Sequence, residues 1–310
     1  MSFKEAKESI IRYFDLDISE SLITEIAESI GGKVYKNDIE KAEIVHENFE
    51  QLIPDIREKD KEKCNLNIMA DGSMVSIKTQ EGLCWKEMKL GMVYKDNNKI
   101  KMTSGKNIIT EKDYVAYLGS PDKFRQLLLN SAIENGYGTT KNTVFIADGA
   151  KWLWNICDDL FPDAIQILDY YHLSENVYKY ANVLYPDDES EKVKWAETVL
   201  TNIKQGRIND VIANLPVIKN NNKDNDQNIP NLRGYLQNNK NRLNYTEYKK
   251  RGFCIGSGAI ESGNKKVIQQ RLKQSGMHWS HSGGQNIASL RVKYCSNKWD
   301  EVENIIYNAA

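Results

Sequence analysis

Two stretches near residues 65 and 90 carry the hydrophobic pattern of β-strands. Residues 65–70 form a short, largely apolar run that ends at Asp71-Gly72. Further along, apolar side chains alternate with polar or small ones at Met88, Leu90, Met92 and Tyr94. A period of two places alternate side chains on one face of a strand. The pattern therefore predicts a strand, a turn and a second strand.

A second series of elements follows from residue 120. Ser120-Pro121 combines an N-cap residue with proline at the first helical position, which predicts a helix that stops near Gly136. Residues 144–147 and 165–168 are continuous apolar runs, as in strands buried on both faces, and a helix is expected over residues 152–160 between them. With a third strand expected before residue 120, this order predicts a mixed α/β sheet of the ribonuclease H type, flanked by helices.

The first 60 residues are predicted to be helical. Asp17 with Glu20 resembles a capping box, and the helix is expected to end at Gly31-Gly32 after apolar residues at helical spacing, which are Leu22, Ile23, Ile26 and Ile30. This region fits either a remnant helix-turn-helix module or a helical hairpin packed on the core. The second alternative is favoured because few basic residues line a recognition face.

The remaining chain is also predicted to be mostly helical. Residues 173–250 are interpreted as a helical insertion, interrupted by an Asn-rich loop over 220–231, and the last helices are expected over 258–273 and 284–294. We therefore expect a small N-terminal region, residues 1–62, that serves in DNA binding or dimerisation, and a catalytic domain over residues 63–310 that contains the insertion.

Charge is distributed unevenly along the chain. The net charge is −1, but residues 231–300 hold 13 Lys and Arg against three acids, Glu247, Glu261 and Asp300. This stretch therefore carries +10 and the remainder −11. A basic third beside an acidic remainder is typical of a polyanion-binding surface joined to a carboxylate-bearing core. A solvated basic face is the alternative.

Composition limits the compartment and the class of metal site. No apolar run approaches the roughly 20 residues that span a bilayer, so no membrane association is expected. The five cysteines form no close pair, and the N-terminus lacks the pattern of a signal peptide, which together predict a cytoplasmic protein. Without a Cys-x-x-Cys grouping, a structural zinc site has little support.

Three acids are candidates for a metal site. Asp71 and Asp148 each precede a glycine directly after an apolar strand, and the two carboxylates would converge if the strands were neighbours. Glu261 falls in the first turns of the helix that Ser257 is expected to cap, although a surface ion pair with Lys265 is the simpler interpretation of this residue alone. Together the three acids suggest two magnesium ions and phosphoryl transfer.

Three segments resemble motifs of DDE transposases of bacterial insertion sequences, in the ISKra-type branch of the Mutator-like superfamily. These segments are IADGAKWLWN, FPDAIQILDYYH and IGSGAIESGNKKVIQQRLKQSGMHWS, and the similarity extends from about residue 65 to residue 300.

This resemblance implies a ribonuclease H-like domain in which Asp71, Asp148 and Glu261 are the catalytic, metal-binding triad. It also implies a helical insertion between the second and third acids. The family's Asp-x-x-His motif is matched by Asp169 and His172, where His172 either touches the scissile phosphate or braces the site, or simply pairs with Asp169 to cap a helix. The residues expected to hold DNA are Asn264, Lys265, Lys266, Arg271 and Lys273.

The implied activity is metal-dependent cleavage of transposon ends and strand transfer into target DNA. It would use two Mg²⁺ or Mn²⁺ ions and no nucleotide cofactor. The expected partner is double-stranded DNA, as terminal inverted repeats and target, bound by a homodimer or larger assembly in the bacterial cytoplasm, associated with the nucleoid. The alternatives are a transposase-derived protein that binds DNA without cutting it, and another ribonuclease H-like nuclease such as a resolvase.

Overall fold

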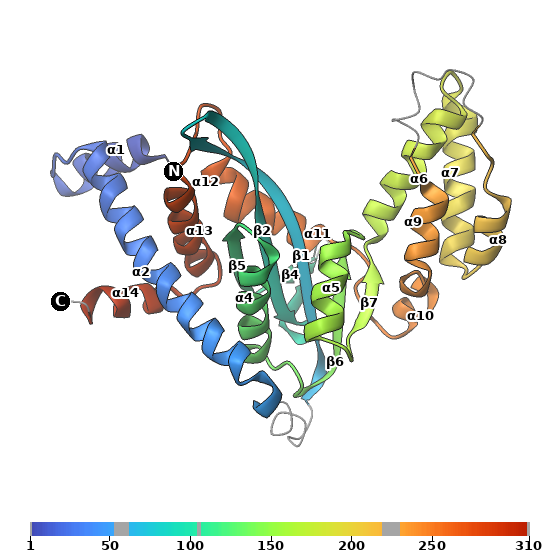
Figure 1. The fold of residues 1–310 in the computed structure, drawn as a ribbon, viewed down its shortest axis with the longest axis horizontal. Coiled ribbons are helices and arrows are strands. Elements are labelled where there is room, and N and C mark those ends of the chain that lie inside the picture. Colours follow the sequence, from blue (N-terminus) through green and yellow to red (C-terminus); the bar gives the residue numbers. More distant parts are fainter. Residues whose placement is uncertain (1, 53–61, 104–106, 219–229, 309–310) are drawn as a thin grey trace. The chain divides into compact units, whose positions relative to one another are not determined.

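The computed structural model describes residues 2–52, 62–103, 107–218 and 230–308 of a mixed α/β protein (Figure 1). Its main sheet has five strands in the order β5-β2-β1-β6-β7. The chain forms two compact units, described separately below. Unit 1 comprises Met1–Thr143 and Gly258–Ala310, and unit 2 comprises Val144–Ser257, so the division falls within β6 (Thr140–Ala147).

A long antiparallel hairpin is the centre of unit 1. It consists of β1 (Glu62–Thr79) and β2 (Gly82–Lys95). The prediction that the first strand ends at Asp71-Gly72 is wrong. The strand continues because Val75 and Ile77 are buried and every residue to Thr79 pairs with β2. The expected third strand is confirmed as β5 (Asp113–Leu118), antiparallel to β2. A small separate hairpin pairs β3 (Lys99–Lys101) with β4 (Asn107–Ile109).

Helices cover both faces of this antiparallel sheet. The predicted helix at Ser120-Pro121 is confirmed as α4 (Pro121–Glu134), which packs where Gly91 leaves room for Phe124 and Leu128. Side chains alternate between faces along a strand. The opposite face, which carries Asp71 and Ile77, is covered by α11 (Gly258–Gly263), by a π-helical segment η4 (Asn264–Gln269), and by α13 (His281–Cys295).

The N-terminal helices belong to the same unit. They are α1 (Phe3–Phe14) and α2 (Glu20–Glu47), with Ser2 and Ser19 as N-caps in place of the expected Asp17. The helical prediction is confirmed, but the predicted stop at Gly31-Gly32 is wrong. A Cβ on Gly31 would lie 2.2 Å from the main-chain oxygen of Asn286 in α13, so glycine permits close packing of two helices here. Figure 1 shows α2 running beside α4 and α13, and these helices fall in the same compact unit as β1 and β2.

Unit 2 joins the end of β6 to β7 (Ile165–Leu168) through α5 (Lys151–Leu160), and the two strands are parallel. The prediction that residues 173–250 are mostly helical is confirmed for the part that the structure describes. Among those residues the helices that follow β7 are α6 (Tyr170–Leu184), α7 (Glu189–Lys204), α8 (Ile208–Asn214), α9 (Leu232–Asn238) and α10 (Tyr245–Lys250), with a short 3-10 turn η3 (Lys240–Arg242) before the last. Most of the predicted Asn-rich loop, residues 219–229, lies outside the described residues.

The C-terminal segment departs from the predicted single helix over 258–273. The segment is divided into α11, the π-helical η4 and α12 (Gln270–Leu272). The helix expected over 284–294 is confirmed within α13, and α14 (Trp299–Tyr307) follows it. Among the described residues, no helix combines the length and the apolar character needed to cross a membrane.

Candidate active site

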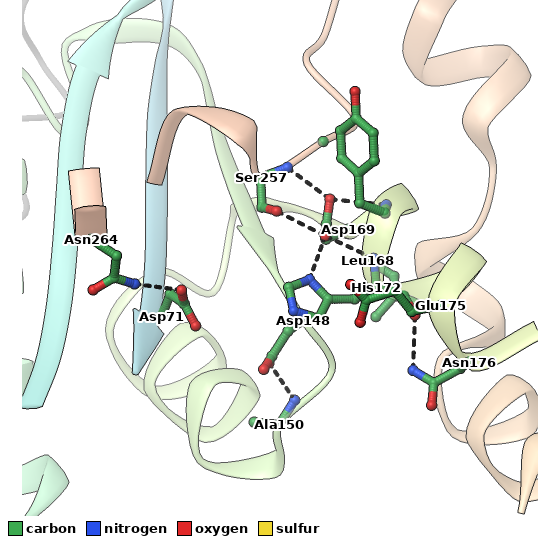
Figure 2. A network of polar contacts seen from close by, with 12 residues as sticks. Asp71, Asp148, Ala150, Leu168, Asp169, His172, Glu175, Asn176, Ser257 and Asn264 are labelled. Atoms are coloured by element: carbon green, nitrogen blue, oxygen red, sulfur yellow. Dashed lines mark hydrogen bonds and ion pairs between the residues drawn. The ribbon is translucent and has the colours of Figure 1, made fainter. Parts of the chain in front are cut away.

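Asp71 is fixed from both sides in the middle of β1. Its Oδ1 accepts a hydrogen bond from the N–H of Gly72 at 2.7 Å, and its Oδ2 accepts one from the side-chain amide of Asn264 (Figure 2). Asn264 begins η4, three residues after Glu261. This contact therefore joins the strand that carries one predicted acid to the helical segment that carries another.

Asn264 is held inside unit 1 instead of lying on its surface. Its side chain is 3% exposed, although we had expected it to contact DNA. Among the described atoms its Oδ1 is buried without a hydrogen-bond partner. Buried amide oxygens are rarely left unsatisfied, and those that are often mark a place for an ion or water. π-Helical turns of this kind are frequent at functional sites.

The other predicted residues of this segment divide into two groups. Glu261, Lys265, Lys266 and Lys273 are exposed. Arg271, in contrast, is only 8% exposed, and its guanidinium lies 4.2 Å from the ring centroid of Phe3 and 4.9 Å from that of Trp279. Cation–π stacking of this kind fixes α1 to the core. In this structure Arg271 braces helices, whereas the three lysines present their charge to solvent.

Asp148 directly follows β6 in unit 2, as predicted. Its Oδ1 accepts the N–H of Ala150 at 2.8 Å, a short turn that opens α5 (Figure 2). The next residue, Gly149, has φ +101°, and a Cβ there would lie 3.0 Å from the ring of Tyr235. Glycine is therefore needed for both the backbone conformation and the close approach. The local sequence holds the Asp148 carboxylate half-exposed at the end of the strand.

Asp169 is the most heavily hydrogen-bonded acid of unit 2. It follows β7, caps α6, and is completely buried (Figure 2). Its carboxylate accepts five hydrogen bonds, from the N–H groups of Tyr171, His172 and Ser257, the Ser257 hydroxyl and His172 Nδ1. Burial alone would raise the pKa of Asp169, but the bonds from His172 and Ser257 outweigh it and lower that pKa. Ser257, expected only as a helix cap, is thus bound to Asp169.

His172 is positively charged at neutral pH in this arrangement. The pKa of His172 is raised to about 9, mainly by the hydrogen bond to Asp169 and against the opposing effect of burial, and the negative charges of Asp169 and Asp148 contribute to the rise. With Nδ1 donating to Asp169, the ring retains an N–H at Nε2. The His172 ring is therefore a cation of fixed orientation, and its charge depends on the buried carboxylate of Asp169.

Two tyrosines that sequence reasoning missed hold the strand ends of unit 2. The Tyr235 hydroxyl donates to the main-chain oxygen of Asp148 at 3.1 Å, and the Tyr245 hydroxyl donates to that of Leu168 at 2.9 Å. Burial raises the pKa of both hydroxyls, so they remain donors at neutral pH. They come from α9 and α10, so the insertion supports the two positions from which Asp148 and Asp169 emerge. Their place in a long helical insertion left no recognisable signal in the sequence.

The structure thus brings Asp71 together with Asn264 in unit 1, and Asp148, Asp169 and His172 together in unit 2. Carboxylate and amide oxygens are the ligands that Mg²⁺ prefers. The half-exposed Asp71 carboxylate, with its Oδ2 held by the Asn264 amide, supplies such oxygens in unit 1. The residues present are therefore compatible with the predicted divalent cation.

The chain was also compared with known proteins. No curated protein matches it. The sequence profile of an uncharacterised family matches residues 23–304, from α2 to α14, and so includes every candidate residue named above. Since this match covers most of the chain, the protein belongs to the uncharacterised protein family UPF0236.

Proposed function

We propose that this protein is a DDE-type DNA transposase that cleaves transposon ends and transfers the strands into target DNA. One observation carries the proposal. Asp71 and Asn264 are 193 residues apart in the chain, yet they are hydrogen-bonded, and Asn264 lies one helical turn from Glu261. A fold that joins Asp71 to the segment of Glu261, which is similar to a transposase motif, is what the proposed triad requires.

In this proposal Asp71, Asp148 and Glu261 hold Mg²⁺ or Mn²⁺, which requires Asp148 of unit 2 to act with the two acids of unit 1. When bound, a pair of such ions activates an attacking oxygen and stabilises a departing one during phosphodiester exchange. Asn264 keeps the Asp71 carboxylate in one orientation by donating to its Oδ2. Preorganisation of this kind avoids the cost of ordering a ligand during the reaction.

The basic residues have separate roles in the proposal. The exposed Lys265, Lys266 and Lys273 hold the phosphate backbone of DNA. His172, kept charged by Asp169, offers its Nε2–H to a phosphate oxygen. Arg271 is left out of this set because its guanidinium is buried between aromatic rings.

The fold is compatible with the proposal but does not distinguish a transposase from other α/β enzymes. The antiparallel half of the sheet, the parallel pair and the helices on both faces agree with a ribonuclease H-like domain. Function depends on the site and not on the fold alone. A direct assay is therefore needed.

The test is a strand-transfer assay with purified protein, Mg²⁺ and DNA taken from both sides of its gene. We expect nicking at the element ends and joining to a target plasmid. Asp71→Asn, Asp148→Asn and Glu261→Gln should each abolish both steps. Two matched controls should retain them. They are Asp187→Asn, an exposed acid of unit 2, and Glu247→Gln, an exposed acid of the same basic stretch as Glu261.

Each alternative has its own outcome in this assay. Cleavage without joining indicates a ribonuclease H-like nuclease. Binding without cleavage in the wild type indicates a DNA-binding protein that has lost the chemistry. Magnesium-dependent cleavage that survives in Asp148→Asn would reject the triad assignment.

A further inference from the structure

The helical insertion of unit 2 carries a charge contrast that the proposed triad does not explain. Residues 231–257, which form α9, η3 and α10, hold six Lys and Arg and one acid, Glu247. The rest of unit 2, residues 144–230, holds 14 acids and eight Lys and Arg. A strongly basic segment within an otherwise acidic unit is expected to attract a polyanion.

This segment also lines a groove built for hydrogen bonding. The groove lies beside β7, and its polar lining is made by Gln166, Gln237, Asn238, Lys240, Asn241 and Arg242. Its described lining includes no carboxylate. Amide and cationic side chains are the groups that proteins direct at phosphate oxygens.

Arg242 is preorganised in this groove. Its Nε donates to the Gln166 side chain at 2.6 Å, its Nη1 donates to the main-chain oxygen of Asn238 at 3.1 Å, and its guanidinium lies 4.2 Å from the ring centroid of Trp154. Gln166 also donates to Asp158 at 2.6 Å, so that carboxylate is engaged at the border of the groove. Lys240 lines the groove and is exposed. Lys249, on α10 of the same basic segment, is also exposed but lies outside the groove lining.

We infer that this insertion groove, together with the exposed lysine of α10 in the same basic segment, binds the phosphate backbone of duplex DNA, as a second contact apart from the proposed triad. The inference rests on the proposed function for the identity of its partner. An acidic protein could also meet a basic groove, but the row of side-chain amides suits the closely spaced oxygens of a phosphodiester backbone. The groove would add affinity without reading base sequence.

The test is duplex binding measured by fluorescence anisotropy between 50 and 200 mM KCl, with full-length protein and a 40-base-pair duplex. The variant is Lys240→Gln/Lys249→Gln. The slope of log affinity against log salt should become shallower by about 0.9 for each lost phosphate contact, with roughly eightfold weaker binding per contact near 0.1 M salt. Lys240→Arg/Lys249→Arg should restore binding.

The matched control is Lys179→Gln/Lys194→Gln, two exposed lysines on α6 and α7 of the same unit. It should leave slope and affinity unchanged. Equal effects of the two double variants, or no effect of either, overturn the inference. So does equally tight binding of polyglutamate through Lys240 and Lys249, because that result indicates an acidic protein partner.

Failure of this inference and failure of the proposed function give different results. If the wild type cleaves DNA and the groove variant binds normally, only the inference fails. If the wild type binds DNA through the groove but never cleaves it, the inference stands and the catalytic proposal fails. A wild-type chain that binds no duplex overturns both.

Discussion

The carboxylates of Asp71 in unit 1 and Asp169 in unit 2 receive their hydrogen bonds from different sets of donors. Asp71 lies in the middle of a strand, and its Oδ2 is bonded to Asn264, 193 residues away. Asp169 follows its strand directly and caps its own helix through the N–H groups of Tyr171 and His172. Three of the five hydrogen bonds to Asp169 come from its own helix, and Ser257, 88 residues away, supplies the other two. Asp71 takes one bond from the adjacent Gly72 and one from the distant Asn264. Both acids can be located from sequence pattern, but their long-range partners Ser257 and Asn264 cannot.

Asp169 and Asp71 also differ in how much of the surrounding structure depends on their hydrogen bonds. Asp169 is fully buried and receives five hydrogen bonds, so its removal would leave several donors unsatisfied. Asp71 is half-exposed and receives its long-range bond from one amide. We therefore expect changes at Asp169 to affect stability first, and changes around Asp71 to affect chemistry first.

The largest effect is expected at Asp148. Replacing Asp148 with Asn removes a proposed metal ligand while the turn to Ala150 can still form through the amide oxygen. The nicking rate should fall by a factor on the order of 10³ or more, as is typical when a group that stabilises transition-state charge is lost. The melting temperature should change little. A large drop in melting temperature would instead give Asp148 the structural role assigned to Asp169.

The next largest effect is expected at Asp169. Asp169→Ala should lower the free energy of unfolding by about 3 to 5 kcal/mol, because a buried charge pair loses one partner and Ser257 loses its acceptor. Urea denaturation followed by circular dichroism measures this. Asp71→Ala provides the comparison and should cost no more than about 1.5 kcal/mol. Equal losses at the two sites would remove the distinction between them.

The pH dependence of His172 sharpens the same comparison. Because its pKa is raised from about 6.5 to about 9, its pairing contributes stability fully below pH 6.5, and that contribution is lost as the pH rises through 9. On the acidic side, the pKa of Asp169 is lowered, so the contribution of its carboxylate to stability is lost as the pH falls through that lowered pKa.

An NMR titration of the four histidine rings checks this prediction. The His172 midpoint should lie near 9 and move down in Asp169→Asn, since the main stabilising hydrogen bond weakens. A His172 midpoint that does not respond to Asp169→Asn contradicts the pairing.

A smaller stability effect than at Asp169 is expected at Asn264. Asn264→Ala removes one hydrogen bond to Asp71, so the free energy of unfolding should fall by about 1 kcal/mol. Binding of Mn²⁺, followed by electron paramagnetic resonance, should nevertheless weaken clearly. The exposed Asn241→Ala is the control and should change neither quantity. Unchanged Mn²⁺ affinity in Asn264→Ala would restrict Asn264 to packing.

Several features could be predicted because they depend on neighbouring residues. The apolar runs located β6 and β7, Ser120-Pro121 located the start of α4, and the aspartates after β6 and β7 were found at strand ends. Other predictions were wrong because a distant segment determines where the helix or strand ends. Gly31-Gly32 has the composition of a helix stop, yet it continues a helix because α13 packs against it. Likewise Asp71-Gly72 continues a strand because β2 pairs along its whole length.

The sequence by itself located the candidate acids, the excess of Lys and Arg after residue 231 and the order of most helices and strands. Each of these depends on composition or on spacing of a few residues. Only the tertiary structure decided that Asn264 turns inward to Asp71, that Arg271 lies between aromatic rings, and that Tyr235 and Tyr245 support two strand ends. The reason is physical. Whether a polar side chain faces solvent or bonds to a remote partner depends on which segments pack against it, and a one-dimensional pattern does not contain that information.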